Sequence, residues 1–237
     1  MRNIFALLAF FLSSMIYGQD IRVEFGYSNL YSKQFDQLIK TYNFSRPFLQ
    51  EQQPLLSHGF HSGLSYLFKS EKVLKSGINL NYSLIRSRAK NKNLDVKLAF
   101  NMLELGYFLN YHNKDKFGDF YSELGLNLVL GLLSKRHNNQ PYLIDDKKVR
   151  SFQAGISLNF NIGYMIELND KYKILPFVDF HYSPYFMEGQ SEVVINQTSD
   201  LIEEQEQYSS FLKFFAGLRF YLSNKKVANN SKPFTSQ

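Results

Sequence analysis

Apolar residues alternate with small or polar residues along most of this 237-residue chain. A period of two is typical of β-strands whose two faces meet different surroundings, because successive side chains of a strand point to opposite sides. Residues 151–164 are the clearest case. There the apolar set is Phe152, Ala154, Ile156, Leu158, Phe160, Ile162 and Tyr164, and the other set is Ser151, Gln153, Gly155, Ser157, Asn159, Asn161 and Gly163. The chain is therefore constrained to form a sheet with one apolar and one polar face.

The same alternation recurs in eight segments, which we expect to be strands. They are residues 21–28, 59–68, 77–84, 103–111, 123–132, 151–164, 178–183 and 213–222. An even number of antiparallel strands can close into an up-and-down barrel that has both chain ends at the same end. The fold class we predict is all-β, an eight-stranded antiparallel barrel.

The glycines indicate which face lies inside. Of the 13 glycines, ten fall on the polar face of the expected strands. A lumen bounded by eight strands is just wide enough for side chains to fill, so small residues belong there. The opposite face is large and apolar along its length, which suits lipid, whereas a soluble barrel would have the two faces reversed. We therefore predict a transmembrane barrel, although the mean hydropathy of −0.29 resembles that of a soluble protein.

Long and short connections alternate between the expected strands. The long ones follow strands one, three, five and seven, with 86–97, 134–150 and 184–210 as the later three; the short ones lie near 70–76, 113–119 and 169–173. Long external loops and short periplasmic turns are typical of outer-membrane barrels, so both termini are expected in the periplasm. In the first loop, Phe35, Leu38, Ile39 and Tyr42 recur at helical spacing, which predicts one short amphipathic helix over 34–43.

The chain begins with a segment typical of a secretory signal. Arg2 precedes an apolar run from Ile4 to Ile16, which is too short to span a bilayer as a helix. We predict a cleaved signal over 1–18, the barrel over 19–223, and a polar periplasmic tail over 224–237. The chain contains no Cys, so it offers neither a lipid anchor on Cys nor a disulfide.

With its leader, its eight alternating segments and the closing sequence GLRFYLSN at 217–224, the chain resembles the small barrels of the OmpA/OmpX type. It resembles more closely the outer-membrane β-barrel domain proteins of Bacteroidota called PorT-like. The resemblance implies a Gram-negative outer-membrane location and an integral barrel. It transfers no functional residue, because the members differ in role.

Seven charged residues fall on the polar face of the expected strands and are the first candidates for chemistry. They are Arg22, Glu24, Glu104, Glu123, Asp179, Lys213 and Arg219. Because the first and last strands close the barrel, we expect Glu24 and Arg219 to be neighbours. An isolated buried charge is costly, so these groups are expected to form a salt-bridged plug that packs the lumen. The alternative is a small channel or porin with an ion path through it.

Asp179, His181 and Ser183 share one face of the seventh segment, which admits a second alternative, a lipid A-modifying hydrolase. The alternation places all three inward, where a hydrogen-bond network explains them without catalysis, and spacing alone does not define a catalytic triad. We therefore predict that the protein is not an enzyme and that it has no catalytic residue.

The remaining motifs indicate neither a metal nor a cofactor. His58 and His61 would lie on opposite faces of a strand, and His112 and His137 have no partner nearby in the sequence. The glycines recur singly and form no phosphate-binding loop. The basic pI of about 9.2 is compatible with nucleic acid, but an exported barrel makes such a partner unexpected.

The expected external loops differ in charge. Residues 86–97 carry net +4, residues 134–150 carry net +3, and residues 184–210 carry net −6. The basic loops suit the phosphates of lipopolysaccharide, and the acidic loop suits a divalent cation or a basic partner. We expect a non-enzymatic barrel with a packed lumen that serves as a structural, cell-surface interaction or secretion-accessory component. Its expected partners are outer-membrane lipid, lipopolysaccharide and an envelope or secretion-system protein.

Overall fold

The structure is a computed structural model of the chain. It describes residues 20–47, 51–68, 74–91, 94–115, 118–144, 147–169, 172–188, 191–196 and 207–222. The predicted signal at 1–18 and the predicted tail at 224–237 lie outside the described residues, and both stay predictions.

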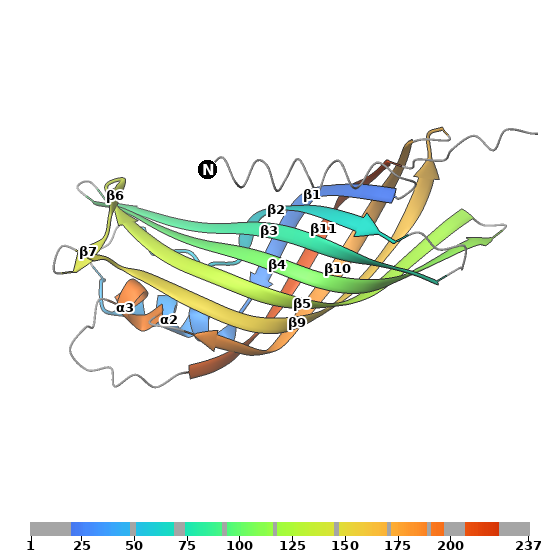
Figure 1. Cartoon of the computed structure of the whole chain (residues 1–237). Helices are drawn as coiled ribbons and strands as arrows, with labels where there is room; N and C mark the ends of the chain where they lie inside the picture. The colour runs from blue at the N-terminus through green and yellow to red at the C-terminus, as the bar shows by residue number, and fades with distance from the viewer. Residues whose placement is uncertain are drawn as a thin grey trace, which may run out of the picture.

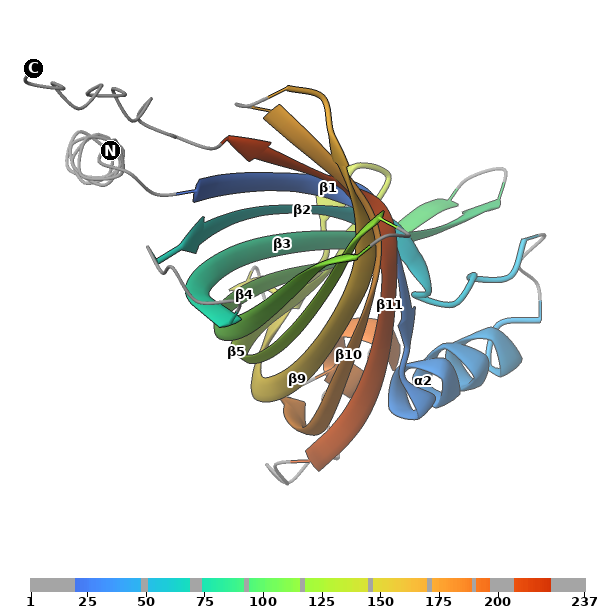
Figure 2. The same ribbon diagram turned by 90° about the vertical axis from the view of Figure 1, so that its right-hand side faces the viewer.

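Eight long strands form one closed antiparallel barrel, which confirms the predicted fold class. They are β1 (Asp20–Tyr31), β2 (His58–Leu67), β3 (Leu74–Asn91), β4 (Leu94–Asp115), β5 (Gly118–His137), β9 (Arg150–Glu167), β10 (Tyr172–Glu188) and β11 (Gln207–Leu222). Each strand pairs with its neighbour in sequence, β5 pairs with β9, and β11 returns to pair with β1 (Figures 1 and 2). The β5–β9 connection contains three two-residue strands: β6 (Gln140–Pro141), β7 (Leu143–Ile144) and β8 (Lys147–Lys148).

The first and last strands close the barrel through a glycine pair. Gly26 lies opposite Gly217 in the β1–β11 ladder. A Cβ atom on Gly217 would stand 2.3 Å from the carbonyl oxygen of Phe25, and one on Gly26 would stand 2.3 Å from that of Ala216. The two strands approach this closely because neither residue has a side chain.

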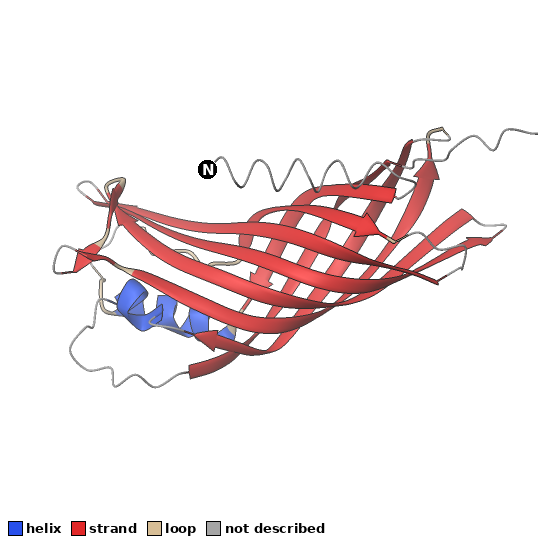
Figure 3. Ribbon diagram, viewed as in Figure 1, coloured by secondary structure: helices blue, strands red, loops and turns tan. Residues whose placement is uncertain are grey.

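The barrel has two different ends. We call the end where β1–β2, β3–β4, β5–β9 and β10–β11 are joined the loop end, and the opposite end the turn end. The described chain starts and finishes at the turn end, since Ile21 pairs with Leu222. Helices α2 (Lys33–Phe44) and α3 (Ser191–Asn196) both lie at the loop end, on the left of Figures 1 and 3. None of the described helices is long and apolar enough to cross a membrane.

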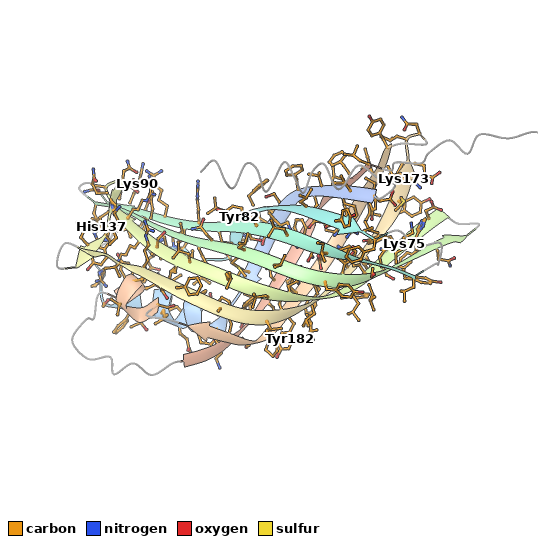
Figure 4. The ribbon with its side chains drawn as sticks, in the orientation of Figure 1. Lys75, Tyr82, Lys90, His137, Lys173 and Tyr182 are labelled. Carbon is orange, nitrogen blue, oxygen red and sulfur yellow. The ribbon has the colours of Figure 1, made fainter. Side chains whose placement is uncertain are left out.

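Between the two ends, outward side chains form an apolar belt. On β5 this belt extends from Phe120 to Leu132, and Leu124 and Leu126 within it are 57% and 53% exposed. All eight long strands contribute large exposed apolar residues to it. Charged residues lie beyond it: Lys90 is at the loop end and Lys75 at the turn end, while Tyr82 lies between them (Figure 4).

On β3 and β4 the apolar residues move from the outward face to the inward face toward the loop end, although the alternation of inward and outward positions continues unchanged. The sequence analysis did not anticipate this change. In the belt, β4 points Leu105 outward and buries Glu104 inside the barrel. Nearer the loop end the same strand buries Leu98 and Phe100 inside and turns Lys97 outward. Along β3 and β4 the inward face therefore carries mainly polar residues in the belt and mainly apolar residues beyond it toward the loop end, while the outward face does the opposite.

This reversal corrects the predicted loop over 86–97. Strand β3 continues to Asn91 and β4 begins at Leu94, so Arg86, Arg88, Lys90 and Lys97 lie on strands. Inward Ile85 and Ala89 are 0% and 1% exposed, and their burial inside the barrel holds the extended hairpin in place. The predicted loop over 134–150 is likewise shorter, because β5 continues to His137. Within 184–210, β10 continues to Glu188 and β11 begins at Gln207.

The helix predicted over 34–43 is confirmed as α2, over Lys33–Phe44. Phe35, Ile39 and Tyr42 are almost fully buried, and the Phe35 ring meets the inward Phe100 ring edge-on with centroids 5.2 Å apart. The short α3, which the alternation did not predict, buries Val194 and Ile195 in the same apolar core. Together the two helices fill the loop end of the barrel.

Candidate functional site

The candidate residues lie in a polar layer inside the belt. All seven charged residues singled out from the sequence are buried there, none more than 2% exposed. They come from β1, β4, β5, β10 and β11, and asparagines from β3, β5 and β9 complete the ring. The layer brings together side chains far apart in the chain because the closed barrel points one face of every strand at the same axis.

Arg22 and Arg219 are at the centre of the first half of this layer. Arg219 Nε donates to Glu24 Oε2 at 2.6 Å, so the predicted Glu24–Arg219 neighbours are confirmed. Arg22 Nη1 donates to Glu123 Oε2, also at 2.6 Å. The hydroxyl of Tyr121 links the two pairs, accepting from Arg22 and Arg219 and donating to Glu123. These four charged groups and one phenol form a single network across the lumen.

The guanidinium groups of the same network also stack on aromatic rings. Arg22 lies 4.2 Å from the centroid of Phe108, and Arg219 lies 4.4 Å from the centroid of Phe177. Stacking of this kind suits arginine, whose planar cation is weakly hydrated. The rings of Phe108 and Phe177 fill the lumen beside the two guanidinium groups.

The second half of the layer is built around Glu104. Lys213 Nζ donates to Glu104 Oε1, and His181 Nδ1 lies 3.4 Å from Glu104 Oε2. Ser83 Oγ lies 2.8 Å from His61 Nδ1 and 3.5 Å from Lys213 Nζ, while His61 Nε2 lies 3.2 Å from Glu24. Ser83 and His61 therefore join the two halves into one continuous network.

Apolar clusters fill the rest of the lumen. One reaches from the polar layer toward the turn end and consists of Leu67, Phe108, Tyr121, Met165, Leu175, Phe177, Phe215 and Tyr221. It is interleaved with the charges, since Tyr121 belongs to the ionic network and the Phe215 ring lies 3.8 Å from the His61 ring, centroid to centroid. Toward the loop end the inward residues of the strands pack with α2 and α3. Two aromatic contacts show how closely the loop-end rings meet: Phe186 lies 5.0 Å from Phe211 and 6.2 Å from Phe100, centroid to centroid. The arrangement is that of a filled barrel.

The arrangement of Asp179, His181 and Ser183 does not support hydrolysis. All three point inward, as the alternation predicts. His181 Nε2 lies 3.1 Å from Asp179, but neither ring nitrogen makes a hydrogen bond to any described residue. Ser183 Oγ donates to the carbonyl oxygen of Ile156 at 2.7 Å. Ser183 is 0% exposed inside the barrel, so its hydroxyl does not face the surrounding lipid.

The histidines likewise form no common site. His58 is exposed and stacks on Tyr27, whereas His61 is buried, which confirms their opposite faces. His112 lies 3.5 Å from Asp119, and the ring of His137 packs on Tyr142. Within the described part of the chain, no three His, Asp or Glu side chains are grouped to hold a metal ion.

The sequence analysis missed Tyr121, the phenol that joins both arginines. It lies two residues before Glu123 on β5 and shares its face, so extending the alternation by one step would have found it. Gln53 and Leu56 were also missed. They follow α2, are 2% exposed, and Gln53 Nε2 donates to Ser87 Oγ at 2.6 Å. No periodicity indicates these two residues, since they lie in irregular chain.

A closed antiparallel barrel leaves no unpaired sheet edge, and this one is surrounded by an apolar belt with polar groups beyond both ends. Such a body satisfies every condition for spanning a bilayer with strands. The chain is a transmembrane β-barrel of the outer-membrane type with a filled lumen.

No protein-family model matches the chain, and no curated protein does. Solved structures similar in shape include neisserial surface protein A (TM-score 0.47, 13% identity, 87% of this chain and 97% of that one). OprG from Pseudomonas aeruginosa is also similar (TM-score 0.43, 11% identity, 87% and 97%). A third is Ail, the attachment invasion locus protein of Yersinia pestis (TM-score 0.38, 9% identity, 86% and 99%). With TM-scores below 0.5, these similarities add nothing to what the closed sheet and the belt show directly.

Proposed function

We propose that this protein is a sealed, non-enzymatic barrel that serves as a structural or interaction component of the outer membrane. The observation that supports this proposal is the filled lumen: a hydrogen-bonded ionic network is interleaved with one apolar cluster, and a second apolar cluster packs with α2 and α3 at the loop end. Conduction would require breaking buried ion pairs or removing close-packed rings. Secretion-accessory and PorT-like roles are compatible with a sealed barrel and stay predictions.

Electrical recording tests the seal. The purified barrel in a planar bilayer is expected to give no steady single-channel current. A variant lacking residues 34–53 opens only the loop end, so it is expected to stay non-conducting because the ionic layer is intact. Steady currents through the unaltered protein would show a channel instead, and would overturn the proposal.

We propose in addition that the loop end faces the cell exterior and the turn end faces the periplasm. The short connections and both ends of the described barrel share the turn end, as in outer-membrane barrels generally. The absence of Cys from the chain makes single-cysteine labelling clean. On intact cells, a membrane-impermeant maleimide is expected to label Lys40→Cys on α2 and to leave Lys75→Cys unlabelled. Labelling of Lys75→Cys alone would reverse the orientation.

A further inference from the structure

Two neighbouring hollows indent the outer surface of the barrel just beyond the belt, toward the loop end. The first has a volume of about 540 Å³, and its lining includes Arg86, Arg88 and Lys97. The second has a volume of about 180 Å³, and its lining includes Lys148 and Arg150. Asn101, Ser134 and Arg136 line both, so the hollows form one surface that we call the basic groove.

The sheet register shows how closely the cations of the groove are set. Arg88 lies directly opposite Lys97, and Lys97 lies directly opposite Arg136. The next row toward the belt places Arg86 opposite Ala99 and Arg150 opposite Ser134. Like charges directly across a ladder destabilise a sheet. A row of three adjacent cations is therefore costly unless an anion neutralises it.

Among the described residues, one carboxylate pairs with this row of cations, and two of the cations share it. Arg88 Nε donates to Asp95 at 2.8 Å, and Lys97 Nζ lies 3.4 Å from Asp95. Within the described residues no carboxylate lies within ion-pair distance of Arg86 or Arg136. Both arginines are exposed and keep their guanidinium donors available for a ligand.

The opposite edge of the groove is apolar. Leu84 lines the first hollow and Leu132 the second, and both belong to the row in which the belt begins. Tyr82 follows one step further into the belt, and its hydroxyl donates to Asn101 Oδ1 at 2.7 Å (Figure 4). A ligand that meets both edges has anionic groups at the level of the arginines and acyl chains beside the belt.

We infer that the basic groove binds the phosphate groups of a phosphorylated glycolipid of the surrounding leaflet, with Arg86 and Arg136 as the principal phosphate-binding residues. Arginine suits this role because its planar fork donates two hydrogen bonds to one phosphate. The position of the groove, at the boundary between belt and water, selects a lipid over a soluble anion. The inference rests on the proposed orientation, which places the groove at the outer leaflet, and it is independent of whether the lumen conducts.

The test measures lipid retention by the full barrel in nonionic detergent. Mixed micelles carry phosphatidylcholine with either bisphosphorylated lipid A or the same lipid with both phosphates removed, and native mass spectrometry counts the lipid bound. We expect the phosphorylated lipid to bind at least about tenfold more tightly, the scale of one or two charge-assisted hydrogen bonds. Arg86→Gln with Arg136→Gln is expected to abolish that preference.

The matched control is Lys33→Gln with Lys40→Gln, which removes two exposed cations of α2 outside the groove. This control is expected to keep the preference. Unchanged urea unfolding of both double variants shows that they fold, since all four side chains are exposed. Inorganic phosphate at millimolar concentration is expected to displace little lipid, because it lacks the acyl chains.

Three results would overturn the inference. The first is equal binding of the two lipids, and the second is an unchanged preference in the arginine variant. The third combines two observations: the unaltered protein shows no preference for the phosphorylated lipid, and it binds a soluble sulfated polysaccharide tightly whereas the arginine variant does not. That result would assign the groove to a soluble polyanion. None of these results bears on conductance, so the sealed-barrel proposal is tested separately.

Discussion

Glu24 shows how a charge is maintained in the middle of this barrel. It contacts Arg219 at 2.6 Å on one side and His61 at 3.2 Å on the other, with all three side chains buried. The pair need not add much net stability, because removing both charges from water is costly. Removing one partner is a different matter, since the other charge is left buried and uncompensated.

We therefore expect Glu24→Gln to lower the free energy of unfolding by about 3 kcal/mol, the usual result of breaking a buried pair. Urea unfolding in phospholipid vesicles measures it. Lys75→Gln is the control: Lys75 lies 3.7 Å from Asp20 and both are partly exposed. That change should cost less than about 1 kcal/mol. Equal stability of the two variants would show that the Glu24 charge is not needed to compensate Arg219.

The Glu24–Arg219 contact was predictable because closure of an up-and-down barrel places the first strand beside the last. The contacts of Arg22 with Tyr121 and Glu123 were not, because they cross the lumen between β1 and β5, which are not neighbours. Cross-lumen contacts depend on the stagger of the strands around the barrel. One sequence gives the face of each residue but not its height along the axis.

The helix α2 is held by its buried face. Ile39 is 0% exposed at the centre of the loop-end core, while Lys40 beside it is exposed. Removing buried methyl groups leaves a cavity that the surroundings only partly fill, so Ile39→Ala is expected to cost about 2–5 kcal/mol. Lys40→Ala is expected to change stability little. Urea unfolding of both variants tests this. If Ile39→Ala left the free energy of unfolding unchanged, α2 would not be part of the stabilising core.

Strand β5 brings one lysine into that core, beyond the last row of the belt. Lys135 Nζ donates to the carbonyl oxygen of Ile195 at 3.0 Å and lies 4.8 Å and 5.0 Å from the ring centroids of Tyr42 and Tyr142. Burial, with a smaller contribution from the charge of Arg46, lowers the pKa of Lys135 to about 7. The amine is thus held where its charged form is disfavoured.

The lowered pKa of Lys135 predicts a pH dependence of stability. Between pH 7 and 10.5 the unfolded chain holds this proton and the folded chain releases it, so stability rises with pH. Relative to Lys135→Met, the wild type should gain at most about 1.4 kcal/mol per pH unit in that window. Unfolding free energies of both proteins at pH 7 and 9.5 measure the difference. A constant difference would place the lysine charge in contact with water.

Among the elements, α2 was predictable because its four apolar residues follow a helical period. The hairpin of β3 and β4 was interpreted as a loop because its charged residues dominated the composition. The alternation continues through it, with Ile85, Ala89 and Leu98 inward, but these apolar residues lie on the face that is polar lower down. When the apolar residues shift from the outward to the inward positions of a strand, the sequence alone suggests that the strand has ended.

Taken as one body, the barrel has a fixed depth in its bilayer. Leu126 lies near the middle of the belt on β5, and Ala99 lies on β4 in the first row beyond it. Leu126→Arg should therefore cost about 2–4 kcal/mol, as a cation at the midplane does. Ala99→Arg should cost less, about 1 kcal/mol, mainly because the new charge would lie opposite Arg86 in the ladder. Reversible unfolding from vesicles measures both. A large cost at Ala99 would move the membrane boundary toward the loop end.

The architecture was the most predictable property of this chain. Alternation over eight segments, glycines on one face and an even strand number are sufficient to define a closed barrel in lipid. What alternation does not encode is which side chains fill each level of the lumen, where ions and aromatic rings are interleaved and apolar residues follow toward the loop end. That sequence of layers emerges only when the strands are staggered against one another.

The change in the character of the two faces along β3 and β4 also protects the barrel against misassembly. A slip of one residue between neighbouring strands would expose apolar residues and bury charged ones at every level. A slip of two residues preserves the faces in an ordinary barrel. Here it would bring the Arg86 and Arg150 row down into lipid, or raise Leu84 and Leu132 into water. The boundary between outward apolar and outward charged residues therefore fixes the height of each of these strands. Only one stagger brings these boundaries to the same level at the membrane surface.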